Sequence, residues 1–289
     1  MKIATTTPVF DANTSSGGGL GALPEWDLRD LYAASDAPEL DRDMTWLEEA
    51  CKSFATDYEG KLATLDAAGL LDCVRRYEAI DVVAGRVMSF AGLRYYQNTM
   101  DSERAKFMGD CQEEITDFTT PLVFFSLEFN RLDEDHLAGL LAANADLARY
   151  KPVFDRMRAM RPYQLSDEME RFFHDQSSVG ASAWNKLFDE TMAGLMFDVA
   201  GEEEPLNLEA TLNLLTDPAR AKREAGARAL AVVFDKNIKL FARVHNTLAK
   251  EKEIEDRWRK MPTPQTARHL SNHVEPEVVE ALRNAVVAA

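Results

Sequence analysis

Residues 161–208 read RPYQLSDEMERFFHDQSSVGASAWNKLFDETMAGLMFDVAGEEEPLNL, and they contain the sharpest change of periodicity in the chain. Ser166 can cap a helix, and the acidic residues after it suit the exposed N–H groups of a first turn. Apolar residues then recur at helical spacing as far as Met192, and Gly194 ends that run. Beyond it, alternating side chains and an acidic Gly-Glu-Glu-Glu-Pro turn predict one small β-hairpin near 195–208.

Outside this stretch, apolar residues recur every three or four positions, which predicts a mainly α fold of long antiparallel helices and helical hairpins. A helix over 102–129 should be kinked at Pro121, which lacks a backbone donor. The segment 219–260 is read as one very long helix or as two that break near 235–237. Asp217-Pro218 is the expected start of that segment. The other expected helices cover 38–58, 66–98, 136–143, 152–160, 208–215 and 277–289.

Composition and charge exclude several classes of function. The 289 residues carry a net charge of −16 with 46% hydrophobic residues, as in a soluble globular protein that binds neither nucleic acid nor an anionic membrane. Cys51, Cys73 and Cys111 form no CxxC and are expected to be small core residues. The sequence has no secretory signal and no apolar run of about 18 residues, so a cytoplasmic location is expected.

Several blocks of sequence, taken in order, resemble one known family. RPYQLSDEMERFF, SAWNKLFDE and the LMFDV hairpin are similar to oligoendopeptidase F, in the thimet-oligopeptidase-like group of zinc metallopeptidases. LPEWDL (residues 23–28), LTDPARAKREAGARAL (215–230) and SNHVEPEVVEAL (271–282) fit the same order. None of these blocks is a catalytic signature.

The resemblance implies a fold and a division of the chain. The fold would be part of a two-lobed peptidase that forms a channel. Residues 1–21, rich in Ser and Gly, are expected to be a disordered tail. Residues 22–193 would form an N-terminal helical lobe, with Trp26 and Leu28 as an anchoring segment. Residues 194–289 would hold the hairpin and the first helices of the catalytic region, truncated before the zinc helix.

The family hydrolyses peptides with a His-Glu-x-x-His helix, in which two histidines bind zinc and the Glu activates water. The sequence lacks this motif. The only pair of histidines at that spacing is His269 and His273, but Leu270 stands where the catalytic Glu belongs. Pro264 and Pro276 flank the pair, which favours a loop or strand. The other histidines are His136, His174 and His245.

Further candidate residues have a plainer explanation. Glu170 and His174 share a predicted helical face, which Glu190 could join. Glu113, Glu114 and Asp117 could suggest a di-iron bundle, but the Glu-x-x-His motif of such sites is absent. An aromatic stripe could line a peptide channel, although its spacing is more typical of a core; it comprises Phe172, Phe173, Trp184 and Phe188. Surface arginines are expected to pair with the surplus carboxylates; they are Arg156, Arg158, Arg161 and Arg171. The sequence therefore predicts no catalytic, cofactor-binding or metal residue in this chain.

Two hypotheses follow from the sequence. The first is the N-terminal part of a zinc-dependent oligoendopeptidase that hydrolyses short unstructured peptides. This chain would form a channel wall, would be inactive alone, and would have short peptides and the missing C-terminal catalytic half as partners. Zinc would belong to the full-length protein. The second is a stand-alone all-α binding or scaffold module with no metal. A His-Glu-x-x-His helix encoded downstream would decide for the first hypothesis, and an in-frame stop for the second.

Overall fold

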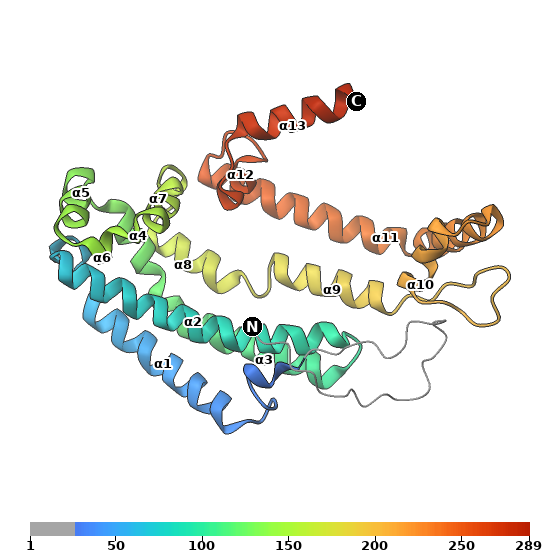
Figure 1. The fold of residues 1–289 in the computed structure, drawn as a ribbon, viewed down its shortest axis with the longest axis horizontal. Coiled ribbons are helices and arrows are strands. Elements are labelled where there is room, and N and C mark those ends of the chain that lie inside the picture. Colours follow the sequence, from blue (N-terminus) through green and yellow to red (C-terminus); the bar gives the residue numbers. More distant parts are fainter. Residues whose placement is uncertain (1–26) are drawn as a thin grey trace.

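The computed structural model describes residues 27–289 and consists of helices arranged in layers (Figure 1). The first helices lie on one side, α8 and α9 follow one another in the middle, and α11 runs along the other side. The mainly α fold predicted from the sequence is confirmed. The predicted tail 1–21 and Trp26 lie outside the described residues.

The first layer contains α1 (Pro38–Tyr58), α2 (Ala67–Gln97) and α3 (Ser102–Thr119), as predicted. Asp66 caps α2 by accepting from the Gly69 N–H at 2.7 Å, and Asp101 caps α3 in the same way. Their apolar faces meet around Phe54, which is fully buried and contacts four other aromatic rings. Leu28, in the short helix η1 (Leu28–Asp30), packs against this core.

The helix predicted over 102–129 is divided rather than kinked. It consists of α3, the 3₁₀ turn η3 (Thr120–Leu122) and α4 (Val123–Arg131). Pro121 lies in η3, where its missing N–H interrupts the ladder of hydrogen bonds. Three short helices then complete this side of the molecule, as predicted apart from α6: they are α5 (Glu134–Ala143), α6 (Ala145–Ala148) and α7 (Lys151–Ala159).

The helical run predicted to reach Gly194 is also divided. It forms α8 (Asp167–Gln176) and α9 (Ala181–Ala193), with a break at 177–180. Gly180 has φ −85° and ψ −129°, outside the helical region, so the helix cannot pass through it. Ser166 is the N-cap residue of α8, but its side chain makes no capping hydrogen bond. The Glu170 carboxylate instead accepts from the Leu165 N–H at 2.8 Å.

The small β-hairpin predicted near 195–208 is not formed as a pair of strands. A single antiparallel bridge joins Phe197 to Leu206, whose N–H groups donate to each other's carbonyls at 2.8 and 2.9 Å. The connection between them is long and includes Gly201 at φ 99°, so no ladder develops. Burial of Phe197 against Ala229 and Leu230 fixes this bridge.

The rest of the chain is built around one long helix. After α10 (Leu208–Asn213) and η5 (Leu214–Thr216), α11 (Arg220–Arg259) continues unbroken for 40 residues. It starts slightly later than predicted, because Asp217 accepts from the Ala219 N–H and Ala219 becomes the N-cap. Two short helices follow, α12 (Thr266–Asn272) and α13 (Pro276–Ala288).

The structure also bears on the predicted burial of the three cysteines and on the hydropathy of the helices. Cys51, Cys73 and Cys111 are all buried, as expected of core residues. Burial raises the pKa of the Cys51 thiol to about 11 and that of Cys73 to about 12. Among residues 27–289, none of the helices combines the length and the apolar character needed to cross a bilayer.

Candidate functional site

A cavity of about 510 Å³ lies where the layers meet. One wall comes from α2, α3, η3 and α4, and the opposite wall from α8, α9 and α11. Its lining is strongly polar, and each wall contributes one aromatic ring, Tyr77 or Phe173. The other lining residues used in the argument are Thr119, Ser126, Glu170, His174, Glu251, Glu255 and Arg259. Glu170 and His174, predicted to share a helical face, do so here. Glu190 is not among the lining residues in the described part of the chain.

The α11 wall of the cavity is a stripe of three charged residues. Glu251, Glu255 and Arg259 are spaced by four, so they lie on one face of the helix. The Arg259 Nε donates to the Glu255 carboxylate at 2.7 Å along this face. The sequence-based predictions did not include this stripe, nor Tyr77, Thr119 and Ser126 on the other wall. The spacing of the stripe is visible in the sequence, but charges elsewhere along the same helix follow it equally well.

Arg259 joins α11 to the start of α8 through a two-pronged ion pair. Its Nη1 and Nη2 donate to the two carboxylate oxygens of Glu170 at 2.7 and 2.9 Å. Nη1 also donates to the Tyr163 carbonyl at 3.3 Å, and the guanidinium lies 5.5 Å from the ring centroid of Phe173. The Arg259 and Glu170 side chains are only 11% and 14% exposed. This fork has the geometry of a strong, specific ion pair.

The electrostatics of the pair favour the charged forms of both groups. Burial alone would raise the pKa of Glu170, but hydrogen bonds from Arg259 and the Leu165 N–H, with the charge of Arg259, outweigh it and lower the pKa. Burial opposes the charge of Arg259 as well, and the carboxylates of Glu170 and Glu255 overcome it, so the pKa of Arg259 is raised. The pair is therefore ionised throughout the neutral range.

Glu251 holds the break between α8 and α9 against α11. Its carboxylate accepts from the Ala181 N–H at 3.0 Å, at the first residue of α9. The space for this carboxylate exists because residue 180 is glycine: a Cβ on Gly180 would lie 2.5 Å from the Glu251 Oε1. Glycine at position 180 therefore leaves room for the Glu251 carboxylate to reach the Ala181 N–H.

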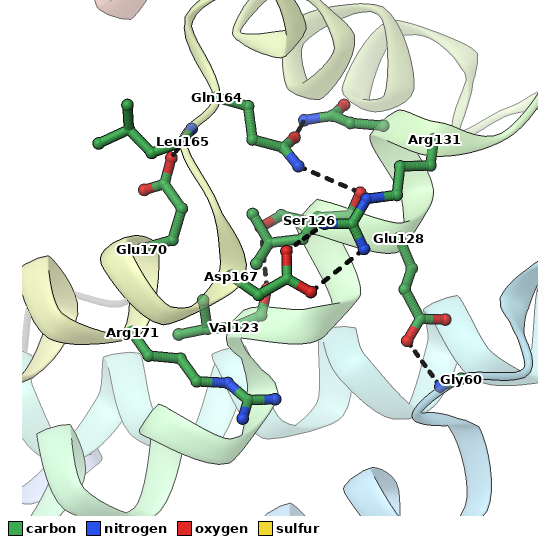
Figure 2. A network of polar contacts seen from close by, with 12 residues as sticks. Gly60, Val123, Ser126, Glu128, Arg131, Gln164, Leu165, Asp167, Glu170 and Arg171 are labelled. Atoms are coloured by element: carbon green, nitrogen blue, oxygen red, sulfur yellow. Dashed lines mark hydrogen bonds and ion pairs between the residues drawn. The ribbon is translucent and has the colours of Figure 1, made fainter. Parts of the chain in front are cut away.

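Several polar contacts fix α8 to the first layer (Figure 2). Arg131 of α4 forms an ion pair with Asp167 in the first turn of α8, and α4 is itself held to the segment after α1, where the Glu128 carboxylate accepts from the Gly60 N–H at 2.6 Å. At the other end of α8, the His174 Nε2 lies 3.2 Å from the Thr119 hydroxyl. These contacts place α8 firmly on the first layer, with its cavity-facing side turned toward α11.

The aromatic stripe is neither a core nor a lining of the cavity as a whole. Phe172 is 54% exposed and Phe188 is 40% exposed, and neither α8 nor α9 contains a buried residue. The prediction that these rings belong to a core is therefore wrong. Helical spacing marks an apolar face, but only packing decides whether that face is covered. Phe173 alone among them lines the cavity, whereas Trp184 is half-buried outside it.

The predicted surface pairs of arginine are found at three positions. Arg158 and Arg161 both reach Glu134, at 2.8 and 3.6 Å, and Arg171 reaches Glu59 at 2.5 Å. Arg158 is nearly buried and also donates to the Leu132 carbonyl. Arg158 and Arg161 stabilise the junction of the short helices, whereas Arg171 joins α8 to the end of α1; none of the three lines the cavity.

The donor groups of residues 27–289 do not fit a zinc or di-iron centre. No group of three or more His, Cys, Asp or Glu side chains in this range could hold a metal ion, the Glu113–Glu114–Asp117 cluster included. The prediction of a loop or strand around His269 is wrong, because His269 lies within α12. His273 follows that helix with φ 52°, so the two residues are not part of one continuous helix.

A family model and a curated protein both show similarity between this chain and oligopeptidases. The model of the family described as Oligopeptidase F matches residues 128–197. The chain is 21% identical over 265 residues to Group B oligopeptidase PepB of Streptococcus agalactiae serotype III (strain NEM316), covering 89% of this chain and 43% of that protein.

Solved structures agree on the fold. The structure of oligoendopeptidase-F from Enterococcus faecium matches with a TM-score of 0.75 at 20% identity, over 86% of this chain and 49% of the other. A putative peptidase from Chlamydophila abortus matches with a TM-score of 0.56 at 16% identity, over 90% and 44%. The chain thus spans less than half the length of each relative. In sequence and in helical fold it is similar to oligoendopeptidase F, as its ordered blocks of sequence predicted.

Proposed function

We propose that this chain is the N-terminal part of a zinc-dependent oligoendopeptidase that hydrolyses short, unstructured peptides. The observation that carries this proposal is the likeness to oligopeptidases over nearly the whole of this chain but less than half of theirs. The metal-binding residues and the general base would then come from the remaining part of the protein. This chain would contribute no step of the chemistry, and its role would be to shape the space that admits the peptide.

The residues that line the cavity between the layers have the chemistry expected of the wall of a peptide channel. They offer hydroxyl, carboxylate and imidazole groups that can hydrogen-bond to a peptide backbone, together with the rings of Tyr77 and Phe173. Addition of an extended peptide as a further strand at 195–208 is not part of the proposal, because a single bridge offers no edge for strand addition.

The proposal is tested first on the complete protein encoded by the gene. We expect a His-Glu-x-x-His sequence downstream of residue 289, and hydrolysis of a quenched fluorescent peptide that stops when a chelator removes the metal and returns with zinc. Replacing the Glu of that motif by Gln should abolish hydrolysis while zinc is still bound. The chain of 289 residues alone should give no hydrolysis. An in-frame stop after residue 289, or chelator-sensitive hydrolysis by the chain alone, would refute the proposal.

The contribution of the wall is tested with a bulky substitution inside the cavity. Ser126→Phe should fill space between the layers and raise KM for a peptide substrate several-fold, by about 1 kcal/mol of binding free energy. Ser271→Phe is the matched control, because Ser271 is exposed on α12. Equal kinetics for both variants would remove this cavity from the path of the peptide.

A further inference from the structure

The helices form two bodies that meet at the cavity. The first body is residues 27–176, in which α1 to α7 gather around the large aromatic core and α8 packs against α3, η3 and α4. The second body is residues 181–289, in which α9, α10 and η5 pack along α11. The chain crosses between them at 177–180, where α8 ends and α9 begins. Figure 1 shows α8 and α9 end to end at this point, with α11 running beside them.

Polar contacts between the two bodies depend almost entirely on one side chain. Within residues 27–289, the only ion pair that joins the bodies is Arg259–Glu170. The other side-chain hydrogen bonds between them run from Arg259 to the Tyr163 carbonyl and from the Gln112 amide to the Ser182 hydroxyl at 3.1 Å. By contrast, Glu251 ties α9 to α11 within the second body.

We propose that Arg259 is a latch: the second body pivots about 177–180, and the Arg259–Glu170 fork holds it closed over the cavity. The inference rests on the proposed function only in so far as the cavity serves a peptide; the motion itself does not depend on it. Arg259 lies eight residues beyond Glu251, which is roughly 12 Å along the helix. A small rotation at the pivot therefore produces a larger displacement at the latch and widens the cavity between them.

Breaking the Arg259–Glu170 fork costs only a moderate free energy, because each partner keeps another polar contact. When the fork breaks, Arg259 keeps the carboxylate of Glu255 on its own helix, and Glu170 keeps the Leu165 N–H. Neither charge is left buried without a partner, which is the condition that makes the loss of a buried ion pair so costly. The phenyl ring of Phe173 loses the guanidinium over its face. The closed state is thus favoured by a fork and a ring contact that the open state lacks.

Distances between spin labels on the two bodies would detect the motion. Ala142→Cys on α5 and Asn272→Cys on α12 provide exposed sites, and the three native cysteines are buried and remain unlabelled. We expect Arg259→Gln to move the distance distribution to longer values and to speed hydrogen exchange at 177–183 by about tenfold or more. Arg257→Gln is the matched control, because Arg257 lies on the same helical turn and pairs with Glu253 at the surface.

A conservative variant keeps the test decisive if the first variant loses helical content. Arg259→Lys retains the charge but cannot form the fork, so it should give a distance distribution between those of the wild type and Arg259→Gln. Distributions for both variants that coincide with the wild type would overturn the latch. Failure of peptide hydrolysis would bear on the proposed function alone, since none of these measurements uses a peptide.

Discussion

The two bodies of this molecule are stabilised by different interactions. In residues 27–176, aromatic and aliphatic side chains from several helices bury one another around Phe54. In residues 181–289, buried side chains are few and gather near the bridge at Phe197, whereas α9, α12 and α13 contain none. The comparison teaches that amphipathic spacing is similar in both bodies, but burial is far more extensive in the first, where every helix from α1 to α7 contains buried side chains.

The largest difference between the bodies should appear when an aromatic ring is removed from each. Phe54→Ala should lower the free energy of unfolding by about 3–5 kcal/mol, because it leaves a cavity inside a dense core. Phe188→Ala, in the second body and 40% exposed, should cost only about 1 kcal/mol. Urea unfolding followed by circular dichroism measures both. Similar costs for the two variants would contradict the contrast between a packed body and an open face.

The next effect concerns the ion pair between the bodies. Arg259→Met should destabilise the closed arrangement by about 2 kcal/mol, less than when a buried charge loses every partner, because Glu170 keeps the Leu165 N–H. Arg257→Met should cost less than about 0.5 kcal/mol, as is usual for surface pairs. The opening free energy from hydrogen exchange of α11 amides measures the difference. Combining Arg259→Met with Glu170→Gln should cost less than the sum of the two, because they remove one interaction.

The same ion pair should make the junction sensitive to acid. The pKa of Glu170 is lowered in the folded protein from its ordinary value of 4.5, so its contribution is complete above that pH and disappears as the pH falls through the folded pKa. The opening free energy of the wild type should therefore decrease in acid below pH 4.5. Glu170→Gln should lack this part of the dependence. Parallel pH profiles for the two proteins would show that Glu170 does not titrate as part of the latch.

The smallest effect is expected at the break between α8 and α9. Gly180→Ala should cost about 1 kcal/mol, because its methyl group displaces the flexible Glu251 carboxylate from the Ala181 N–H. In a Glu251→Ala background the cost should disappear. Gly85→Ala is the control, since a Cβ there meets nothing within 4 Å and alanine should stabilise α2 by about 0.5–1 kcal/mol. Thermal unfolding of the four variants separates the loss of this contact from a general effect of alanine.

The sequence predicted most helices well because their signals are local. Capping by Asp66 and apolar spacing placed α2 almost to the residue, and the helix predicted over 277–289 agrees with α13 to within one residue at each end. It was less successful where two signals compete. Gly180 and Pro121 divide helices whose apolar spacing continues on either side, and the alternation near Phe197 suggested strands where only one bridge forms. Periodicity reports which face is apolar, not whether backbone geometry lets the element continue.

The cavity shows even more clearly how far local sequence signals can predict structure. Glu170 and His174 could be placed together because they lie one turn apart on one helix. Arg259, the partner of Glu170, is 89 residues away from it, and nothing near Arg259 in the sequence distinguishes it from the other charged residues of α11.

By itself, the sequence determined a mainly helical chain, the positions of its long helices and its resemblance to oligoendopeptidase F, because capping, spacing and ordered blocks are properties of neighbouring residues. Only the tertiary structure decided which apolar faces are covered and that Arg259 meets Glu170 across the cavity. The physical reason is that burial and ion pairing depend on which helices pack together, and contacts between distant residues leave no mark in either local stretch.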